Sequence, residues 1–408
     1  MKTEIVTKIE KDSNENPRKN WKELTLEKIA ELSKEVYLPN HDEELSYIGL
    51  EHIDQQTLSL NSIGKSTDVT SSKFRFKNGD ILFGKLRPYF RKVYRPKFSG
   101  ICSTDIWVVR AKSQIDQSWL FYLFTGENFI KLASGGSSGT RMPRADWHHL
   151  KDTAWLVPEL FEQKRIAEIL SSLDDKIELN RKINNNLEKI ASLLFKQWFI
   201  DIDNDLPKGW KIKPLQEVFD FLEGPGIRNW QYSETGTRFI NIRLINKGDI
   251  DVVSANYINQ KDVDEKYQHF LLEKDDLVLS ASGTLGRSAI VRKNHLPLLL
   301  NTSVIRFRPR DGISYPFMYQ YLHSSAFLKE QVSLSSGSVQ ANFGPTHLKQ
   351  MSVIVPDDET LAKFNKICGS FYKLILFNLD QNNLLQRTRD SLLSRLMSGK
   401  IRVNEKYE

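Results

Sequence analysis

Residues 160–198, LFEQKRIAEILSSLDDKIELNRKINNNLEKIASLLFKQW, decide the fold of this 408-residue chain. Their apolar side chains recur in alternating steps of three and four residues, which is the spacing of a coiled-coil seam. The seam residues are Ile166, Leu170, Leu173, Ile177, Leu187, Ala191, Leu194 and Trp198. The same spacing returns further along the chain at Phe364, Cys368, Phe371, Ile375, Leu385, Leu392 and Leu396. The sequence therefore predicts two long helices, over residues 159–203 and 357–400.

Asparagines interrupt the seam at the same two places in both copies. They are Asn180 and Asn184 in the first copy and Asn378 and Asn382 in the second. Asparagine in a seam costs stability, but it can fix the register by pairing with a partner amide. Unpaired amides would be costly to bury, so we expect the two helices to pack on each other as an antiparallel coiled coil. The alternative is that each helix packs only on the chain segment before it.

The segment before each helix is also repeated. Trp21 recurs as Trp210, and Pro158 recurs as Pro356. Short apolar runs bounded by turn residues indicate a strand-rich unit. We therefore predict an α/β (α+β) fold with two similar modules, 21–158 and 204–356, joined by the two helices. Residues 1–20 are predicted to be a frayed polar terminus and 401–408 a short tail. A chance similarity between the two modules is disfavoured, because the helices that follow them repeat in the same register.

Composition limits the possible partners. The chain carries 58 Lys and Arg against 51 Asp and Glu, a net charge of +7, which suits a polyanion. No apolar run reaches the length of a membrane span, and the charged start does not resemble a signal peptide. The two cysteines, Cys102 in the first module and Cys368 in the second long helix, are expected to be reduced, so we predict a cytoplasmic protein without a membrane partner.

The motifs of common catalytic sites are missing from the sequence. A phosphate-binding loop needs a glycine five residues before its Gly-Lys-Ser sequence. In this chain Ser59 occupies that position ahead of Gly64-Lys65-Ser66. No Pro-Pro dipeptide of an amino-methyltransferase occurs, and the histidines lack zinc-binding spacing. We predict a binding protein with no catalytic residue, metal or cofactor of its own. A methyltransferase or nuclease with its own active site, and a coiled-coil scaffold that does not read sequence, are the alternatives.

Basic and polar side chains gather in equivalent loops of the two modules. Lysine and arginine can neutralise phosphates, and arginine, glutamine and asparagine can also read base edges. The predicted contacts with double-stranded DNA are Lys85, Arg87, Tyr89, Arg91, Lys92, Ser138, Thr140, Arg141 and Arg144 in the first module and Arg228, Asn229, Ser280, Ser282, Thr284, Arg287, Ser338, Gln340 and Asn342 in the second. The two modules share the sequence pattern of their scaffold but differ in the residues of these loops. We therefore expect the modules to read different DNA sequences.

The chain resembles the specificity subunits of type I restriction-modification systems. The resemblance rests on Trp21 and Trp210, on DILFGKLRPYF from Asp80, on VPELFEQKRIAEILSSLDDKIELNRK from Val157, and on LPKGW from Leu206. It implies two target recognition domains, each reading half of a split DNA target. It also implies two methylation (M) subunits that dock on the helices and use S-adenosylmethionine to methylate adenine. Two restriction (R) subunits driven by ATP would join them, so S-adenosylmethionine, ATP and Mg are expected on the partners.

One departure from the family pattern concerns the helices. Glu162-Gln163 in the first helix corresponds to Thr360-Leu361 in the second, so the typical Glu-Gln pair occurs once. The departure bears on whether both helices present identical surfaces to partner subunits.

Overall fold

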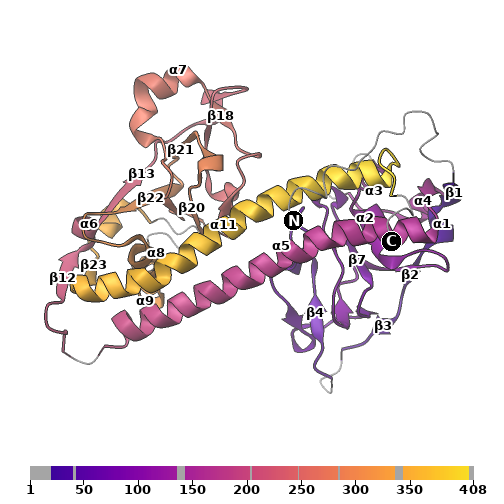
Figure 1. The fold of residues 1–408 in the computed structure, drawn as a ribbon, viewed down its shortest axis with the longest axis horizontal. Helices are drawn as coiled ribbons and strands as arrows, with labels where there is room; N and C mark the ends of the chain where they lie inside the picture. Colours follow the sequence, from indigo (N-terminus) through magenta and orange to yellow (C-terminus); the bar gives the residue numbers. More distant parts are fainter. Residues whose placement is uncertain are drawn as a thin grey trace. The chain divides into compact units, whose positions relative to one another are not determined.

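The computed structural model describes residues 20–39, 43–135, 143–202, 205–246, 248–283, 285–335 and 343–403. The chain divides into two compact units (Figure 1). Unit 1 comprises residues 1–177 and 384–408, and unit 2 comprises residues 178–383. Each unit therefore contains one module and a portion of both long helices.

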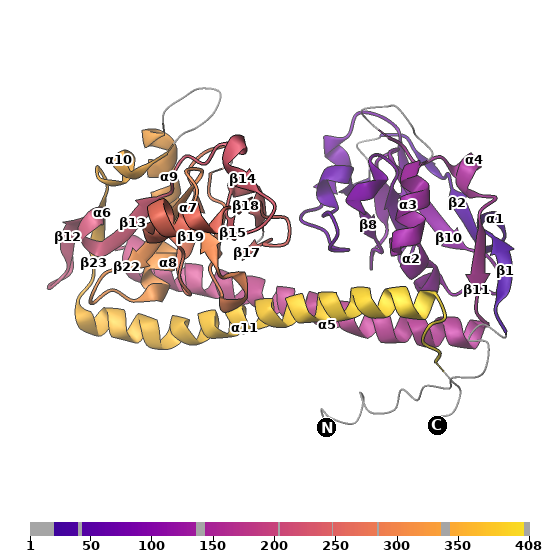
Figure 2. The ribbon, with the colours of Figure 1, turned by 90° about the horizontal axis from the view of Figure 1, so that it is seen from above.

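The two long helices are α5 (Leu160–Phe195) and α11 (Asp358–Met397). A π-helical turn, η4 (Lys196–Ile200), extends α5. Each helix begins within one residue of the start that the seam spacing predicts. In both units, the helices lie along one side of the module (Figure 2). No helix in the described part of the chain is both long and apolar enough to cross a membrane.

The seam asparagines of unit 2 are buried and pair across the two helices. Asn180 Nδ2 donates to Asn382 Oδ1 at 2.9 Å, and Asn378 Nδ2 donates to Asn184 Oδ1 at 2.8 Å. Because 180 pairs with 382 and 184 with 378, the helices run antiparallel. The alternative in which each helix packs only on its own module is therefore wrong.

Replacing Asn184 with leucine is expected to lower the free energy of unfolding by about 1–3 kcal/mol, because the buried Asn378 amide loses its acceptor. The double variant Asn184→Leu, Asn378→Leu should recover most of that loss, since an apolar pair then fills the seam. Chemical denaturation of the wild type, both single variants and the double variant gives the coupling energy. Additive losses in the double variant would contradict the pairing.

The main sheet of unit 1 is antiparallel, with strands in the order β2-β10-β7-β8. Its strands are β2 (Ala30–Ser33), β10 (Ile106–Ala111), β7 (Ile81–Gly84) and β8 (Val93–Tyr94). Side chains alternate between its two faces. Ile81 and Phe83 join the core with α5 and the helices α2 (Gln117–Thr125) and α3 (Glu127–Gly135), whereas Leu82 faces a second sheet. Both faces are covered, which explains the continuous apolar run of β7.

The remaining elements of unit 1 complete these layers. The second sheet has the order β3 (Val36–Tyr37), β6 (Lys73–Phe76), β9 (Gly100–Cys102), β4 (Ser46–Ile48) and β5 (Gly64–Lys65). A two-stranded sheet pairs β1 (Lys22–Thr25) with β11 (Ala154–Val157). The short helices are α1 (Leu26–Ile29), α4 (Trp147–Leu150), η1 (Leu50–His52), η2 (Ser66–Asp68) and η3 (Pro88–Phe90).

Unit 2 repeats the main sheet, the small sheet and the helices of unit 1. The main sheet has the order β13 (Phe219–Glu223), β22 (Val304–Pro309), β19 (Leu277–Ser280) and β20 (Ser288–Ile290), and β12 (Lys211–Pro214) pairs with β23 (Ser352–Val355). The corresponding helices are α6 (Leu215–Val218), α8 (Tyr315–His323), α9 (Ser325–Leu334) and α10 (Pro345–Leu348). The same strand orders confirm the duplicated α/β fold.

The second sheet of unit 2 differs from that of unit 1. Its order is β14 (Tyr232–Ser233), β18 (Tyr257–Ile258), β15 (Thr237–Phe239) and β21 (Leu298–Leu299), and β16 (Ile245–Asn246) pairs separately with β17 (Asp249–Ile250). The short helices of this region are α7 (Gln260–Asp262), η5 (Asn229–Gln231), η6 (Ile242–Leu244), η7 (Val263–Tyr267), η8 (Gln268–Phe270) and η9 (Lys293–His295). The modules therefore share a scaffold and diverge in this sheet.

A tryptophan and a carboxylate tie each module to the start of a long helix. Trp21 Nε1 donates to Glu162 at 2.9 Å, and Trp210 Nε1 donates to Asp357 at 3.0 Å. Gln163 is also buried and accepts a hydrogen bond from the Asp116 N–H at 2.7 Å. The Glu162-Gln163 pair is thus internal to unit 1 and is not part of the exposed surface of α5.

Candidate nucleic-acid interface

Three separate segments of unit 1 meet at the end of β7. The Lys85 N–H donates to the Asp105 carbonyl at 2.9 Å, and the Ala145 N–H donates to the Lys85 carbonyl at 2.8 Å. The Arg87 N–H donates to the Pro143 carbonyl at 2.7 Å. The loop after β7, the turn before β10 and the segment before α4 therefore form one cluster, which we call loop cluster 1. It brings the predicted residue Arg144 next to the loop of residues 85–92.

Arg144 is the exposed cation among the described residues of loop cluster 1, whereas Lys85 and Arg87 are half-buried. The Arg144 side chain is 61% exposed, and its guanidinium lies 3.5 Å from Asp105. The Lys85 ammonium lies 4.0 Å from the same carboxylate. The Tyr89 ring is also exposed, and the Arg87 guanidinium lies 5.9 Å from the centroid of the Phe90 ring. The exposed Arg144 forms an ion pair that costs little to break, so a phosphate can compete for this cation.

Two of the predicted contacts face the interior instead. The Arg91 guanidinium lies 3.6 Å from Asp390 of α11, and burial lowers its pKa. The Lys92 ammonium donates to the Leu50 carbonyl, and burial lowers its pKa as well. Arg91 and Lys92 therefore fasten the loop to its own unit, and the prediction that they contact DNA needs correction. A charge run in the sequence does not show which of its side chains point inward.

Unit 2 builds an equivalent cluster from different residues. The Ala281 N–H donates to the Ser303 carbonyl at 2.9 Å, and the Phe343 N–H donates to the Ala281 carbonyl at 2.8 Å. These contacts join the loop after β19, the turn before β22 and the segment before α10. We call this arrangement loop cluster 2. It repeats the backbone geometry of loop cluster 1 with other side chains.

The predicted contacts of unit 2 fall into two groups. Ser280 is fully buried, and its hydroxyl accepts a hydrogen bond from the Arg287 N–H at 3.1 Å. Its predicted contact with DNA is therefore not supported, because the hydroxyl braces the turn. Ser282 is half-buried, and Arg287, Arg228 and Asn229 are exposed. Ser138, Thr140, Arg141, Thr284, Ser338, Gln340 and Asn342 lie outside the described residues.

Arg243 joins loop cluster 2 although the sequence does not single it out. The Ile242 N–H donates to the Ser303 hydroxyl at 3.3 Å, and a Cβ on Gly283 would lie 3.9 Å from the Ile242 side chain. The next residue, Arg243, is exposed and makes no ion pair within the described part of the chain. It lies in the second-sheet region, where the two units differ in strand order and sequence, so the repeat gave no signal for it.

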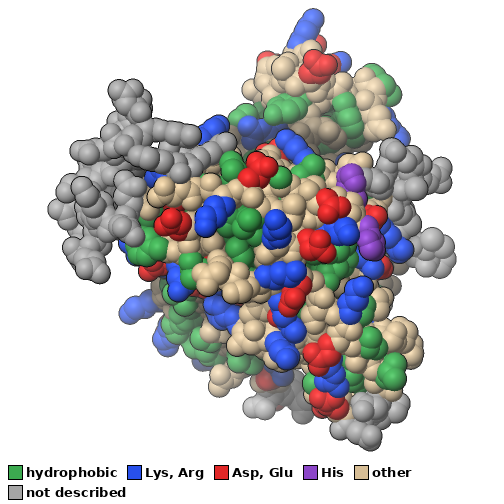
Figure 3. Space-filling view, turned by 90° about the vertical axis from the view of Figure 1, so that its right-hand side faces the viewer, with side chains coloured by type: hydrophobic (Ala, Val, Ile, Leu, Met, Phe, Trp, Pro, Cys, Tyr) green, Lys and Arg blue, Asp and Glu red, His purple; other side chains and the backbone are tan. Residues whose placement is uncertain are grey.

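Charge on the surface is mixed rather than gathered into one block. Figure 3 shows a face on which lysine and arginine side chains alternate with aspartate and glutamate. A long-range field of one sign therefore does not dominate this face. Contacts with a polyanion would depend on individual loop cations.

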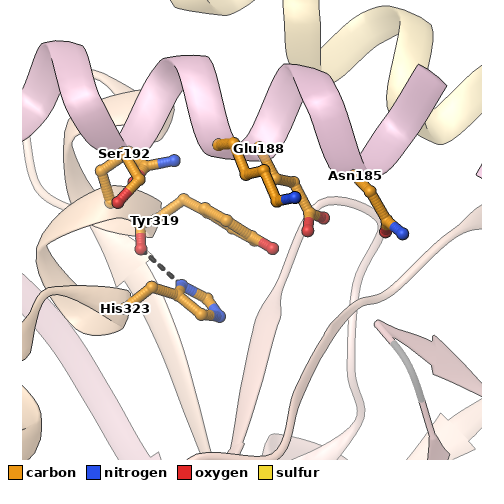
Figure 4. Close-up of a pocket in the computed structure, with 7 residues that line it drawn as sticks. Asn185, Glu188, Ser192, Tyr319 and His323 are labelled. Atoms are coloured by element: carbon orange, nitrogen blue, oxygen red, sulfur yellow. Dashed lines mark hydrogen bonds between the residues drawn. The ribbon is translucent and has the colours of Figure 1, made fainter. Parts of the chain in front are cut away.

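A cavity of about 290 Å³ in unit 2 lies between α5 and α8 (Figure 4). The Tyr319 and His323 rings stack with centroids 4.0 Å apart. His323 Nδ1 donates to the Tyr319 carbonyl at 2.6 Å, and Nε2 accepts from the Ser288 hydroxyl at 2.6 Å. Burial lowers the pKa of His323 and raises that of Glu188. Both histidine nitrogens are occupied within the fold, so this histidine is not poised as a general base.

Among the described residues, no group of three or more His, Cys, Asp or Glu side chains is placed to hold a metal ion. Cys102 and Cys368 are buried free thiols, and burial raises the pKa of Cys368 to about 11. A thiol with a raised pKa is a poor nucleophile.

Comparison with known proteins agrees with this arrangement. The model of a family described as the type I restriction modification DNA specificity domain matches residues 18–189 and 207–387. The specificity subunit of the type I restriction enzyme MjaIX of Methanocaldococcus jannaschii is 28% identical over 72% of this chain and 71% of that protein. The HindI specificity subunit of Haemophilus influenzae is 23% identical over 94% and 100% of the two chains.

A solved structure shows the same fold. The S subunit of a type I restriction-modification system from M. genitalium aligns over 95% of this chain and 97% of that chain, with a TM-score of 0.55 at 17% identity. The family model matches both halves of the sequence and most of its length. The chain therefore belongs to the family of type I restriction-modification DNA specificity domains.

Proposed function

We propose that this chain is the specificity subunit of a type I restriction-modification complex and that each unit reads one half of a bipartite DNA target. The observation that carries the proposal is the repeated backbone geometry of loop clusters 1 and 2, which present different side chains. A common scaffold with different loops is what two readers of different sequences require, because base contacts give specificity and phosphate contacts give position.

The chain itself is proposed to be non-catalytic, with methylation and restriction carried by two M and two R subunits. S-adenosylmethionine, ATP and Mg would then belong to those partners. The helices offer matching apolar positions for two copies of one partner. Ile169 on α5 and Ile367 on α11 are both exposed, as are Leu179 and Phe377. Exposed apolar side chains at equivalent positions are typical of an interaction surface. We also propose a cytoplasmic location, because the proposed ligand is duplex DNA.

A methylome comparison tests the proposal. Modified adenines would be mapped in a host that expresses the chain with its methylation partner and in a host that lacks only this chain. We expect one split motif to disappear without the chain. Exchanging loop cluster 2 for that of a relative should change one half of the motif and leave the other half intact. An unchanged methylome, with the partner shown to be expressed and active, would overturn the proposal.

The two competing functions give different results with the purified chain. An enzyme with its own active site would methylate or cut DNA without partners. A scaffold that does not read sequence would bind DNA with a strong salt dependence but without preference among duplexes. We expect no reaction from the isolated chain, and we expect the chain with its methylation partner to prefer duplexes that carry the motif.

A further inference from the structure

Trp230 is the most exposed large apolar side chain in the described part of the chain, at 82%. It lies in η5, between β13 and β14 of unit 2, and its neighbours Arg228 and Asn229 are exposed as well. An indole in water gains no burial energy from folding. The fold of unit 2 therefore does not require tryptophan at this position.

The segment that carries Trp230 is fixed at both ends. The Thr302 N–H donates to the Pro225 carbonyl at 3.2 Å, and a Cβ on Gly224 would lie 2.4 Å from the Asn301 nitrogen. Glycine alone permits that approach of the two backbones. At the other end, Gln231 Nε2 donates to the Tyr267 hydroxyl at 3.1 Å, and Gln231 Oε1 accepts from the Arg228 N–H.

A fixed turn presents its side chains at low entropic cost. Binding to a flexible loop must order the loop, whereas a turn that is already bonded does not incur that loss. Gly224, Pro225 and Gly226 are turn-forming residues, which by composition alone would indicate a flexible edge. The hydrogen bonds instead make this edge a defined part of the surface of unit 2.

The charge around Trp230 suits a polyanion. Arg228 is the one charged residue between Gly224 and Ser233. It makes no ion pair with any residue that the structure describes, so its positive charge is available. The base of the segment also adjoins loop cluster 2, because Thr302 contacts Pro225 and the next residue, Ser303, contacts Ala281.

We propose that Trp230 is a DNA-contacting residue of unit 2, whose indole packs against the bases of one half-site while Arg228 binds a neighbouring phosphate. This inference rests on the proposed function and extends it to a residue in the region where the second sheets of the two units differ. Apolar side chains contact the thymine methyl group and can wedge into base steps. Aromatic rings also stack on bases that leave the helix.

The test uses the complex of this chain with its methylation partner and a duplex that carries the motif found by the methylome comparison. Trp230→Ala is expected to weaken binding to that duplex about tenfold, which is the effect of losing one base contact of about 1.4 kcal/mol. Trp230→Phe should retain part of the affinity, because it keeps an aromatic ring. Val253→Ala is the matched control, since Val253 is 81% exposed in the same unit.

The outcomes separate this inference from the proposed function. If the wild-type complex yields no split motif, the proposed function fails before Trp230 is tested. If the wild type yields the motif and Trp230→Ala changes neither affinity nor the half of the motif read by unit 2, the inference is overturned. Loss of partner assembly on size-exclusion chromatography, with DNA binding retained, also overturns it and assigns Trp230 to a protein interface.

Discussion

Replacing Arg389 with methionine is expected to lower the free energy of unfolding by about 3–5 kcal/mol, the usual cost of breaking a buried ion pair. Arg389 is a buried residue of α11 in unit 1. Its Nη1 donates to Asp174 of α5 at 2.7 Å, and its Nη2 donates to Asp390 at 3.0 Å. The Tyr122 hydroxyl of α2 donates to Asp174 at 2.7 Å, so one guanidinium joins both helices and the module.

The loss should be large because methionine leaves two carboxylates without their strongest donor. Asp174 keeps the Tyr122 hydroxyl, which is a neutral donor and compensates a negative charge less well. Chemical denaturation followed by tryptophan fluorescence measures the change. Arg395→Met is the control, because Arg395 is exposed on the same helix and its replacement should cost less than about 0.5 kcal/mol. Equal effects of the two substitutions would show that the buried network is not what stabilises unit 1.

Replacing Arg292 with methionine is expected to destabilise unit 2 by about 3 kcal/mol for the same reason. Arg292 is buried, and its guanidinium donates to Asp249 of β17 and to Asp380 of α11. The Arg292 N–H donates to His295 Nδ1 at 3.1 Å, so Nε2 carries the ring proton and donates to Asp249 at 3.1 Å. Lys293→Met, which removes an exposed neighbouring charge, is the control and should be nearly neutral.

Acid unfolding should reveal the same network through Asp249. Burial alone would raise the pKa of Asp249, but the His295 and Arg292 hydrogen bonds and the Arg292 charge outweigh burial and hold it at about 2. Because the folded pKa is below the unfolded value of 3.8, the carboxylate stabilises unit 2 above about pH 4. That contribution, about 2 kcal/mol, is lost as the pH falls from 4 to 2.

The Arg292→Met variant should begin to lose stability at a higher pH than the wild type, since the pKa of Asp249 then rises. Asp249→Asn should flatten this part of the pH profile, because it has no carboxylate to titrate. Midpoints of thermal unfolding between pH 2 and 6 give both profiles. If the low-pH part of the stability profile does not move in Arg292→Met, the pKa of Asp249 does not depend on the Arg292 guanidinium.

Much of the fold could be predicted because its signals are local or repeated. The seam spacing placed the starts of α5 and α11 to within a residue, and the asparagine positions anticipated the antiparallel pairing that Asn184 and Asn378 show. The duplication also predicted equivalent loops in two modules. It gave little information about residues 224–270, since the second sheet of unit 2 differs in strand order from that of unit 1.

The candidate site was predicted only as a set of loops. Lys85, Arg91 and Lys92 are all basic and lie within eight positions, yet Lys85 faces Asp105 of loop cluster 1 while Arg91 and Lys92 bond inward. The partner of Arg91 is Asp390, which lies almost 300 residues away in the sequence. Local spacing cannot indicate such a partner. The same reason explains why Arg243 was missed as a neighbour of loop cluster 2.

The sequence by itself determined that this protein has two similar modules and two long paired helices. Heptad spacing and internal repeats depend on residues close together or at a fixed offset, so they are visible without coordinates. The tertiary structure alone decided which charged residues brace the fold, as Arg389 and Arg292 do, and which stay exposed at the surface, as Arg287 does. The direction of a charged side chain is set by the burial and the opposite charges that distant segments bring to it.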